Sequence, residues 1–353
     1  MLVVSWSLFV VLCSPPSVLC PTFPGACLRY IGSLPLAEKA LIARIRRQAA
    51  SPSRVSTGIG DDCAVLGLPR GHEVLITTDF SLEGVHFRRD WHPAKSVGHR
   101  CLARGLSDIA AMGGRPVAAF LSLALPRTVP QSWVDEFVRG LLALARSFDV
   151  RLDGGDTAQS PQGILADIVV LGSVPRGTAV LRSSARPGDR IYVSGTLGGS
   201  AAALERLLLE PRHKLNPREF PQQFFPQPQI ALGRILRQRG LVSAMIDLSD
   251  GLSTDVGHLC DESAVGAELR AEAIPLAAIG GTGEKVSLRA ALHGGEDYEL
   301  LFTASPEQRL PSRIARIPIT EIGRITRAKK VILLAGQHTR RNLKPQGWQH
   351  FVP

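Results

Sequence analysis

Apolar residues follow helical and strand-like spacing in alternation along the first half of the chain. Residues 36–48 place apolar side chains at helical spacing, and Pro52 ends that predicted helix. Two more helices are predicted at Val97–Met112 and Trp133–Phe148. The predicted strands are Cys63–Leu66, Val74–Thr78, Ala118–Leu125 and Ile164–Val174, with Val150–Leu152 leading into a glycine turn at residues 154–156. This alternation is typical of an α/β layer.

The amino-acid composition changes around residues 174–190, where the segment SVPRGTAVLRSSARPGDR indicates a domain junction. A strand from Ile191, a glycine-rich turn and a helix rich in Ala and Leu follow, and the Pro- and Gln-rich residues 213–229 predict a loop. The remaining clear elements are a helix at Ile230–Arg239, a strand at Val242–Ile246, a helix at Ser253–Cys260 and a turn followed by a strand in LHGGEDYELLFT. We therefore expect two domains, residues 34–180 and 181–353.

The first 33 residues lie outside this pattern. The apolar run Leu2–Cys13 is too short to span a bilayer, and no basic residue precedes Arg29, so the charged region of a secretory signal is missing. We interpret residues 1–33 as a disordered or non-native extension, with a targeting segment or a membrane-associated tail as alternatives. No other segment approaches the length of a transmembrane helix.

The formal net charge of +10 raises the question of nucleic-acid binding. Lys and Arg are scattered singly or in pairs, and only 5% of residues are aromatic, so no basic stretch carries stacking side chains. A basic protein that acts on anionic substrates explains the charge as well. The six cysteines are widely spaced without a CxxC pair, which argues against a zinc site.

Six aspartates close or flank apolar runs, most of them beside glycines. They are Asp62, Asp79, Asp108, Asp156, Asp247 and Asp250. A carboxylate at the end of a buried strand is costly unless a positive charge meets it. Six such residues in one chain predict carboxylates that converge on Mg²⁺, whose oxygen-rich sites usually accompany phosphate chemistry.

Taken one at a time, these positions leave alternatives open. Asp108 lies in the last turn of its predicted helix, where the helix dipole disfavours an anion by about 0.3–1 kcal/mol, so either a metal or a salt bridge would compensate it. Asp247 and Asp250 frame Ser249 at a strand-to-helix turn, where capping is the alternative to metal binding. The glycines at 195–199 predict either phosphate contact or tight packing. Walker, Rossmann and GxSxG motifs are absent from the sequence.

Taken together, the motifs resemble those of the thiamine-monophosphate kinases, a family of the aminoimidazole ribonucleotide synthetase-like superfamily. The matching segments are GIGDDCAVL, TTDFSLEGVHF, CLARGLSDIAAMGGRP, DGGDT, LRSSARPGDRIYVSGTLGGSAA, IDLSDGL, GGEDYELLFT and the closing GW-x-HF. They run in order from Leu34 to Phe351. The resemblance implies an N-terminal α/β domain that pairs across a homodimer and a C-terminal α+β domain.

The resemblance also implies a reaction, in which ATP phosphorylates thiamine phosphate to thiamine diphosphate in the cytoplasm, without nucleic-acid or membrane partners. It implies several Mg²⁺ ions, held at Asp62, Thr77, Thr78, Asp79, Asp108, Asp156, Asp247 and Asp250. Arg182, Ser249 and Asp156 would contact ATP, while His86, Glu296 and Trp348 would face thiamine phosphate. The attacking phosphate oxygen is already anionic, so no protein nucleophile or base is expected.

One departure from the family pattern and one alternative function accompany this interpretation. After the Gly-Gly-Asp-Thr segment the family often continues Thr-Arg, whereas this chain has Ala158-Gln159, so another basic residue would have to neutralise phosphate. The alternative is a sister ATP-dependent synthetase with another substrate. A non-catalytic binding protein of the same fold would have lost acidic residues that this chain retains.

Overall fold

The computed structural model describes residues 35–49, 59, 63–64, 66–211, 214–280, 282–336 and 339–348. The extension at 1–33 and Asp62 therefore lie outside the described residues. The first described helix, α1 (Glu38–Ala49), agrees with the helix predicted at residues 36–48 and buries Leu41 and Ile45.

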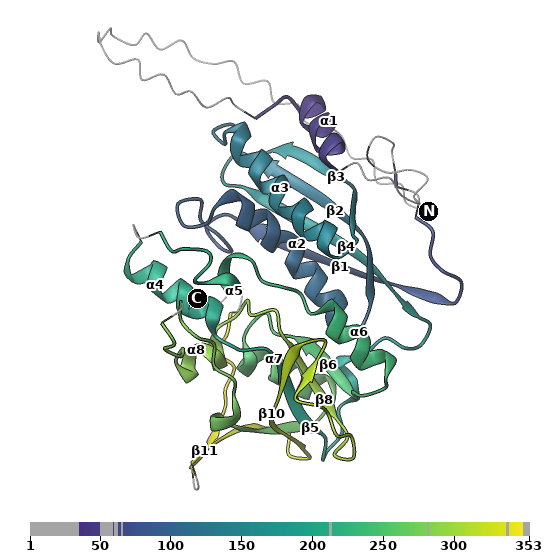
Figure 1. The fold of residues 1–353 in the computed structure, drawn as a ribbon, viewed down its shortest axis with the longest axis vertical. Helices are drawn as coiled ribbons and strands as arrows, with labels where there is room; N and C mark the ends of the chain where they lie inside the picture. The colour runs from purple at the N-terminus through teal and green to yellow at the C-terminus, as the bar shows by residue number, and fades with distance from the viewer. Residues whose placement is uncertain are drawn as a thin grey trace, which may run out of the picture. The chain divides into compact units, whose positions relative to one another are not determined.

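A four-stranded sheet forms the N-terminal part of the described chain (Figure 1). Its strands are β1 (His72–Leu82), β2 (Arg115–Leu125), β3 (Arg151–Gln159) and β4 (Leu165–Pro175), in the order β1-β4-β2-β3. Strand β4 is antiparallel to both β1 and β2, whereas β2 and β3 are parallel. Helices α2 (Ala94–Ala111) and α3 (Gln131–Ser147) lie side by side on one face of the sheet.

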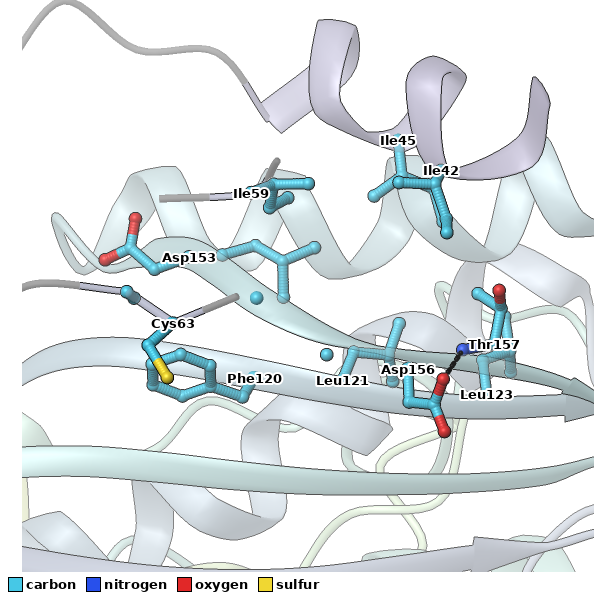
Figure 2. Close-up of a pocket in the computed structure, with 14 residues that line it drawn as sticks. Ile42, Ile45, Ile59, Cys63, Phe120, Leu121, Leu123, Asp153, Asp156 and Thr157 are labelled. Atoms are coloured by element: carbon cyan, nitrogen blue, oxygen red, sulfur yellow. Dashed lines mark hydrogen bonds between the residues drawn. The ribbon is translucent and has the colours of Figure 1, made fainter. Parts of the chain in front are cut away.

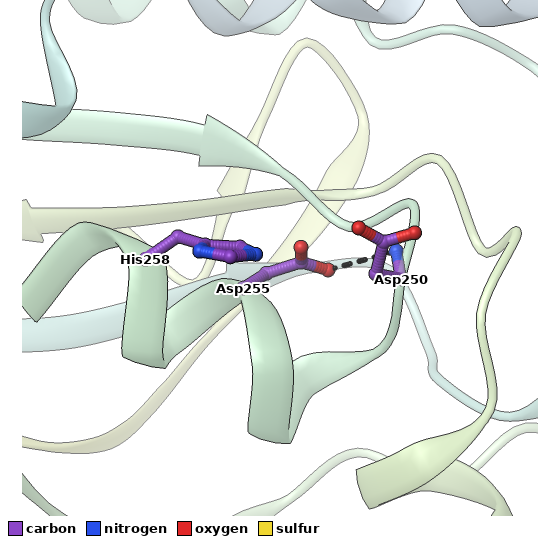
Figure 3. A group of neighbouring side chains, drawn as sticks. All are labelled: Asp250, Asp255 and His258. Carbon is purple, nitrogen blue, oxygen red and sulfur yellow. Dashed lines mark hydrogen bonds between the residues drawn. The ribbon is translucent and has the colours of Figure 1, made fainter. Parts of the chain in front are cut away.

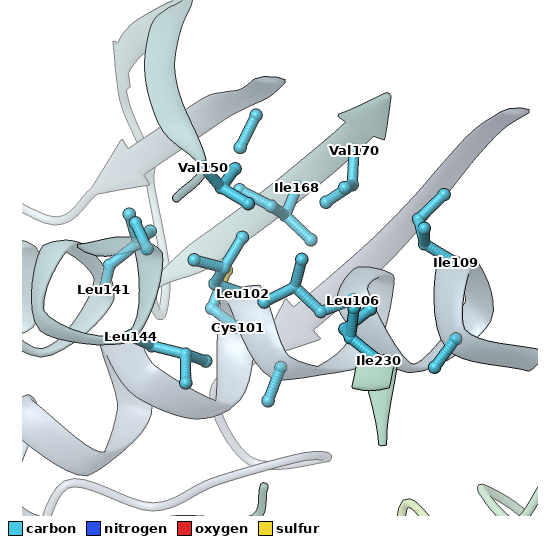
Figure 4. Close-up of a cluster of buried hydrophobic side chains, with 14 of the residues drawn as sticks. Cys101, Leu102, Leu106, Ile109, Leu141, Leu144, Val150, Ile168, Val170 and Ile230 are labelled. Atoms are coloured by element: carbon cyan, nitrogen blue, oxygen red, sulfur yellow. The ribbon is translucent and has the colours of Figure 1, made fainter. Parts of the chain in front are cut away.

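The core between these helices and the sheet follows from the spacing of apolar residues on α2. Leu102, Leu106 and Ile109 recur every three or four residues, so they form one face of the helix. Figure 4 shows this face packed among side chains that include Ile168 and Val170 of β4, and all five are at most 2% exposed. Each such side chain contributes about 1.5–3 kcal/mol by its burial. This packing fixes α2 against the sheet and so positions the residues at its C-terminal end.

A second, mixed sheet forms the C-terminal part of the described chain. Its strands are β5 (Arg190–Ser194), β6 (Ala244–Asp247), β7 (Gly266–Arg270), β8 (Leu300–Ala304), β9 (Arg313–Ile314), β10 (Ile317–Thr326), β11 (Val331–Ala335) and β12 (Thr339–Asn342). The order is β12-β11-β7-β10-β5-β8-β6, and β9 pairs with β10. The helices of this part are α4 (Gly199–Leu209), α5 (Pro221–Phe224), α6 (Ile230–Gln238), α7 (Leu252–Glu262) and α8 (Leu288–His293), with 3₁₀ turns η1 (Arg182–Ser184) and η2 (Ala271–Ala273).

The predicted fold class, α/β followed by α+β, is confirmed. Helices α2, α3, α4, α6 and α7 and strands β2, β4, β5, β6 and β8 lie where the sequence predicted them, within a few residues. Strands β7 and β9–β12 were not predicted. Among the described residues, none of the helices has both the length and the apolar content needed to cross a bilayer.

Two predicted strand ends were wrong. Asp79 lies inside β1, which continues to Leu82 because β4 pairs with it along its whole length. Residues 154–156 belong to β3 and form no turn. Gly155 makes this possible, since a Cβ at this position would lie 1.9 Å from the Leu121 carbonyl oxygen of the neighbouring strand. Only glycine lets the two strands approach so closely there.

Two smaller predictions also failed. The described residues of the predicted strand at 63–66, which are Cys63, Ala64 and Leu66, lie outside any strand. The predicted loop at 213–229 contains the short helix α5, which begins with Pro221, a residue whose fixed φ suits a first helical turn.

Candidate functional site

Three aspartates from distant parts of the chain meet where α2 lies against β1 and β6, and we call Asp79, Asp108 and Asp247 the acid cluster. The Thr77 hydroxyl donates a hydrogen bond to the Asp108 carboxylate, which joins β1 to the last turn of α2. The Ser107 hydroxyl donates to Asp247 Oδ2 at 2.7 Å, which joins the same turn to the end of β6. The tertiary fold therefore unites aspartates of both sheets.

Burial and mutual repulsion raise the pKa values of the acid cluster. Burial, followed by the charge of Asp108, raises the pKa of Asp79 to about 7. The same two causes raise the pKa of Asp247 to about 7, and burial raises the pKa of Asp108. The Arg182 charge opposes the upward pKa shifts of Asp108 and Asp247 but does not cancel them. Buried carboxylates of this kind are stabilised in their charged form by a divalent cation.

The turn after β6 adds further carboxylate oxygens. Asp255, in the first turn of α7, accepts hydrogen bonds from the backbone amides of Asp250 and Gly251 at 3.2 and 3.0 Å. Figure 3 shows Asp255 between Asp250 and His258, and the ligand atoms of these three side chains lie within 4.8 Å of one another. Burial and the charges of Asp247 and Asp250 raise the pKa of Asp255 to about 8.

The geometry of this turn shows whether Asp247 or Asp250 caps helix α7. The N-cap residue of α7 is Gly251, at φ 103°, and no side chain caps it there. Asp255 instead bonds the turn from inside the helix, so the capping alternative does not apply to Asp247 or Asp250.

Two of the predicted ligands lie away from the acid cluster. Side chains of residues paired across a sheet share a face, and Phe80, Asp167, Ser122 and Asp156 form one such row. Successive residues of a strand point to opposite faces of the sheet. Asp79 and Ile168 belong to the next row and face α2, so the row with Asp156 lies on the opposite, outer face. Thr78 shares the outer face and donates to Asp167 Oδ1 at 2.9 Å. The side chains of Asp156 and Thr78 therefore do not join the acid cluster within one chain.

Asp156 borders a separate cavity of about 590 Å³, at the edge strand β3. Figure 2 shows Ile42 and Ile45 of α1 on one side of it, with Leu123 and Thr157 on the other. The Asp156 carboxylate accepts a hydrogen bond from the Thr157 amide at 2.8 Å. The cavity is mainly apolar where α1 lines it, so Asp156 is one of few charged groups there.

The glycines at 195–199 pack tightly around a carboxylate of the protein itself. Both oxygens of Asp297 accept from the Gly198 amide at 3.0 Å, at the start of α4. A Cβ at Gly198 would lie 2.8 Å from the Ala291 nitrogen, and its φ of 86° also favours glycine. The structure thus favours the packing alternative, since the Asp297 carboxyl group already occupies this helix N-terminus.

Two of the residues predicted to face thiamine phosphate, His86 and Glu296, lie beside two arginines of α2. Glu296 forms ion pairs with Arg100 and Arg104, which we call the arginine pair. Burial alone would raise the pKa of Glu296, but the two guanidinium charges lower it to about 2. The charge of His86 lowers the pKa of Glu296 further, so these two predicted residues are brought together.

The backbone of Trp348 is hydrogen-bonded to the turn that follows β6. Its amide donates to the Asp250 carbonyl at 3.3 Å, and the Gly347 amide donates to Thr254 Oγ1 at 3.2 Å. The Trp348 side chain is 52% exposed. The C-terminal segment therefore brings an accessible aromatic ring to the site.

Sequence reasoning missed Asp255, Asp167 and the arginine pair. Asp255 could have been found as a further acid five residues after Asp250, in the first turn of the following helix. Arg100 and Arg104 are four residues apart, so they lie on the same face of the predicted helix, where buried cations would need a partner. Asp167 interrupts a strand of apolar residues, but nothing in the sequence shows which face it occupies.

Comparison with known proteins extends these observations. Residues 60–174 match the N-terminal domain of AIR synthase related proteins, and residues 186–335 match their C-terminal domain. The thiamine-monophosphate kinase of Salmonella typhimurium is 40% identical over 299 residues, which cover 82% of this chain and 90% of that protein.

Two solved structures resemble this one to different degrees. AaThiL complexed with AMPPCP and TMP has a TM-score of 0.69 and 32% identity, covering 93% of this chain and 99% of the other. The hydrogenase maturation protein HypE in complex with ATP has a TM-score of 0.70 over 87% of this chain and 94% of the other, at 18% identity. The second likeness concerns the fold alone.

Proposed function

Because this chain belongs to the thiamine-monophosphate kinase family of AIR synthase related proteins, we propose that it transfers the γ-phosphoryl group of ATP to thiamine phosphate, giving thiamine diphosphate and ADP. The acid cluster is the observation that carries this function. It supplies anionic oxygens at the point where both sheets meet, which is what a kinase needs to hold Mg²⁺ between polyphosphates.

The residues of the acid cluster fit Mg²⁺ by their chemistry. Their carboxylates are hard oxygen donors, they come from three separate elements, and burial leaves them short of positive charge. We propose that Asp79, Asp108 and Asp247 hold Mg²⁺ together with Thr77 and Asp250. When bound, the ions would neutralise the repelling phosphate groups of the two substrates.

The protein's own residues orient the reaction. Ser107 and Thr77 hold the carboxylates of Asp247 and Asp108 by hydrogen bonds, so these oxygens are fixed before substrate arrives. No protein base is required, since the attacking phosphate oxygen is already anionic near neutral pH. Catalysis then consists of holding the attacking and leaving oxygens in line and screening charge.

The nucleotide and the acceptor would occupy different sides of the acid cluster. Arg182 acts on the charges of Asp108 and Asp247, which supports its proposed contact with ATP beside Ser249. His86 and Glu296 lie near Asp79 on the acceptor side, and the accessible ring of Trp348 could stack on the cationic thiamine ring system.

We further propose a homodimer that covers the outer face of the four-stranded sheet. This face exposes Val74, Ile76 and Phe80 of β1 by 39%, 65% and 53%, a larger apolar patch than one strand usually shows to water. Asp156 and Thr78 lie on the same face. Their predicted roles towards metal and ATP would then involve the second copy, because neither side chain reaches the acid cluster in its own chain.

Arg127 is our candidate for the basic residue missing at Gln159. Its Nε donates to Gln159 Oε1 at 3.0 Å, so a guanidinium lies beside the position where the family often has arginine.

We propose the cytoplasm as the location, because it supplies the co-substrate ATP and Mg²⁺.

The direct test incubates the purified chain with ATP, Mg²⁺ and thiamine phosphate and follows thiamine diphosphate by chromatography. Formation of thiamine diphosphate with matching ADP is expected, and omission of Mg²⁺ should abolish it. ADP without thiamine diphosphate would instead support the alternative, a sister ATP-dependent synthetase that acts on another substrate.

A further inference from the structure

The arginine pair is unusual because two buried cations share one carboxylate. The side chains of Arg100 and Arg104 are 4% and 11% exposed, and Glu296, at 27%, is the acid that both contact. Arg100 Nη2 donates to Glu296 Oε2, and Arg104 Nη2 donates to Oε1 at 2.5 Å. Together the three groups carry a net charge of +1 in a place where water is scarce.

Each arginine also retains an unused donor. Among the described residues, Arg100 Nη1 and Arg104 Nε are buried without a hydrogen-bond partner. A buried donor without a partner is costly, more so on a charged group, so natural proteins rarely keep two of them side by side without a use. Both guanidinium groups line a small cavity with Ser81 and His86, whose volume of about 10 Å³ suits one oxygen atom or water molecule.

The fold connects this cavity to the acid cluster. Arg104 Nη1 donates to the Phe80 carbonyl at 3.2 Å, directly after Asp79, and the charge of Arg104 acts on Asp79. On the other side, the Glu296 amide donates to the Ser249 carbonyl at 2.8 Å, between Asp247 and Asp250. Glu296 keeps a φ of 65°, a strained conformation for this residue, so its position is imposed by the surroundings.

We propose that the arginine pair binds the phosphate group of the acceptor, and that Glu296 is a positioning residue that holds the two guanidinium groups in place for it. A phosphate monoester is the ligand that two convergent guanidinium groups with spare donors recognise best. Glu296 then acts on the substrate through the arginines, and its carboxylate stays bound to them. This inference rests on the proposed function, because it assigns the place of the acceptor phosphate in that reaction.

The test compares two ligands that differ only in the phosphate group. Titration calorimetry measures the binding of thiamine phosphate and of thiamine to the unchanged chain in Mg²⁺, and to the variants Arg104→Met and Arg104→Lys. We expect Arg104→Met to weaken thiamine phosphate binding at least tenfold and to leave thiamine binding within twofold. Arg104→Lys keeps the positive charge but loses the planar guanidinium group with its paired donors. It should therefore weaken thiamine phosphate binding by less than Arg104→Met. Arg89→Met, which removes an exposed arginine paired with Glu83, is the matched control and should change neither.

Glu296→Gln tests the positioning role through the ratio of the two affinities. A lower preference for thiamine phosphate over thiamine is expected, since the guanidinium groups lose their anchor. An equal loss for both ligands in Arg104→Met, or no loss for either, would show that the arginine pair is structural or holds only water, and would overturn the inference. An unchanged ratio in Glu296→Gln would overturn the positioning role. Because binding is measured without ATP, failure here is distinct from failure of the unchanged chain to make thiamine diphosphate.

Discussion

The acid cluster and the carboxylate of Glu296 are neighbours linked through Arg104, yet their pKa values move in opposite directions. Asp79 and Asp247 have pKa values raised to about 7, whereas that of Glu296 is lowered to about 2. Burial favours the neutral form in all three. Glu296 differs because two guanidinium groups accompany it, while the neighbours of each aspartate include another aspartate.

This difference separates a part of the site that carries excess positive charge from a part that carries excess negative charge. The arginine pair more than neutralises Glu296 and leaves positive charge for an anionic ligand. The acid cluster holds excess negative charge when its carboxylates are ionised, and a bound cation would balance that charge. A site with both parts can bind Mg²⁺ and phosphate next to each other, as phosphoryl transfer requires.

The largest expected effect comes from removing a carboxylate of the proposed metal site. Asp79→Asn or Asp250→Asn should lower kcat by about 10³-fold or more, because the proposed metal site loses a ligand. For Asp79→Asn the midpoint of urea unfolding should stay the same or rise, since a repelling buried charge disappears. Asp90→Asn, an exposed aspartate paired with Arg88, is the control. Activity near that of the unchanged chain in either variant would mean that the metal roles are misassigned.

Removing the charge of Glu296 should lower stability as well as the preference for thiamine phosphate. Glu296→Gln leaves two buried guanidinium groups without their anion, which should lower the free energy of unfolding by about 2 kcal/mol. The control Glu136→Gln breaks an exposed pair with Arg139 and should cost about 0.5 kcal/mol or less. Urea unfolding measures both changes. Equal losses in the two variants would show that the buried pairs are no stronger than a surface pair.

Trp348 should influence the acceptor alone. Trp348→Ala is expected to raise KM for thiamine phosphate about tenfold through the loss of ring stacking, with KM for ATP nearly unchanged. Steady-state kinetics with each substrate varied in turn measures the two constants. The exposed Leu209 provides the control variant Leu209→Ala, which should change neither. Equal increases in both KM values would argue against a role on the acceptor side.

The smallest effect concerns pH and metal together. The pKa values of Asp79 and Asp247 rise from 3.8 in the unfolded chain to about 7, so the folded chain binds more protons and its stability falls as pH rises between these values. Mg²⁺ favours the charged form, so it should raise Tm by a few degrees more at pH 8 than at pH 5.5.

Glu296 predicts the opposite pH dependence of stability, at lower pH values than the two measured. Its pKa falls from 4.5 to about 2, so its contribution to stability is complete above about pH 4.5 and is lost only as pH falls towards 2. Scanning calorimetry with Mg²⁺, and with NaCl at equal ionic strength, separates the two groups. The same Tm increase at pH 5.5 and pH 8 would contradict a metal site in the acid cluster.

The family resemblance and the local pattern identified most of the chemistry before the fold was known. Helical spacing located α2 and placed Asp108 in its last turn, because the period of 3.6 residues is a local property. The apolar run before Asp247 located β6 in the same way. Motif order from the N-terminal to the C-terminal part fixed the fold class, since each motif matched the family at a distinct position.

Only the tertiary structure decided which of these residues meet. The side of the sheet that an aspartate faces depends on strand pairing, so Asp79 and Asp156 looked alike in sequence but lie on opposite faces. The length of β1 and the path of β3 depended on partner strands that sequence spacing does not reveal. Arg100 and Arg104 found their anion almost two hundred residues away. Ion pairs between residues so far apart in the sequence form only when whole elements pack together, so local sequence cannot predict them.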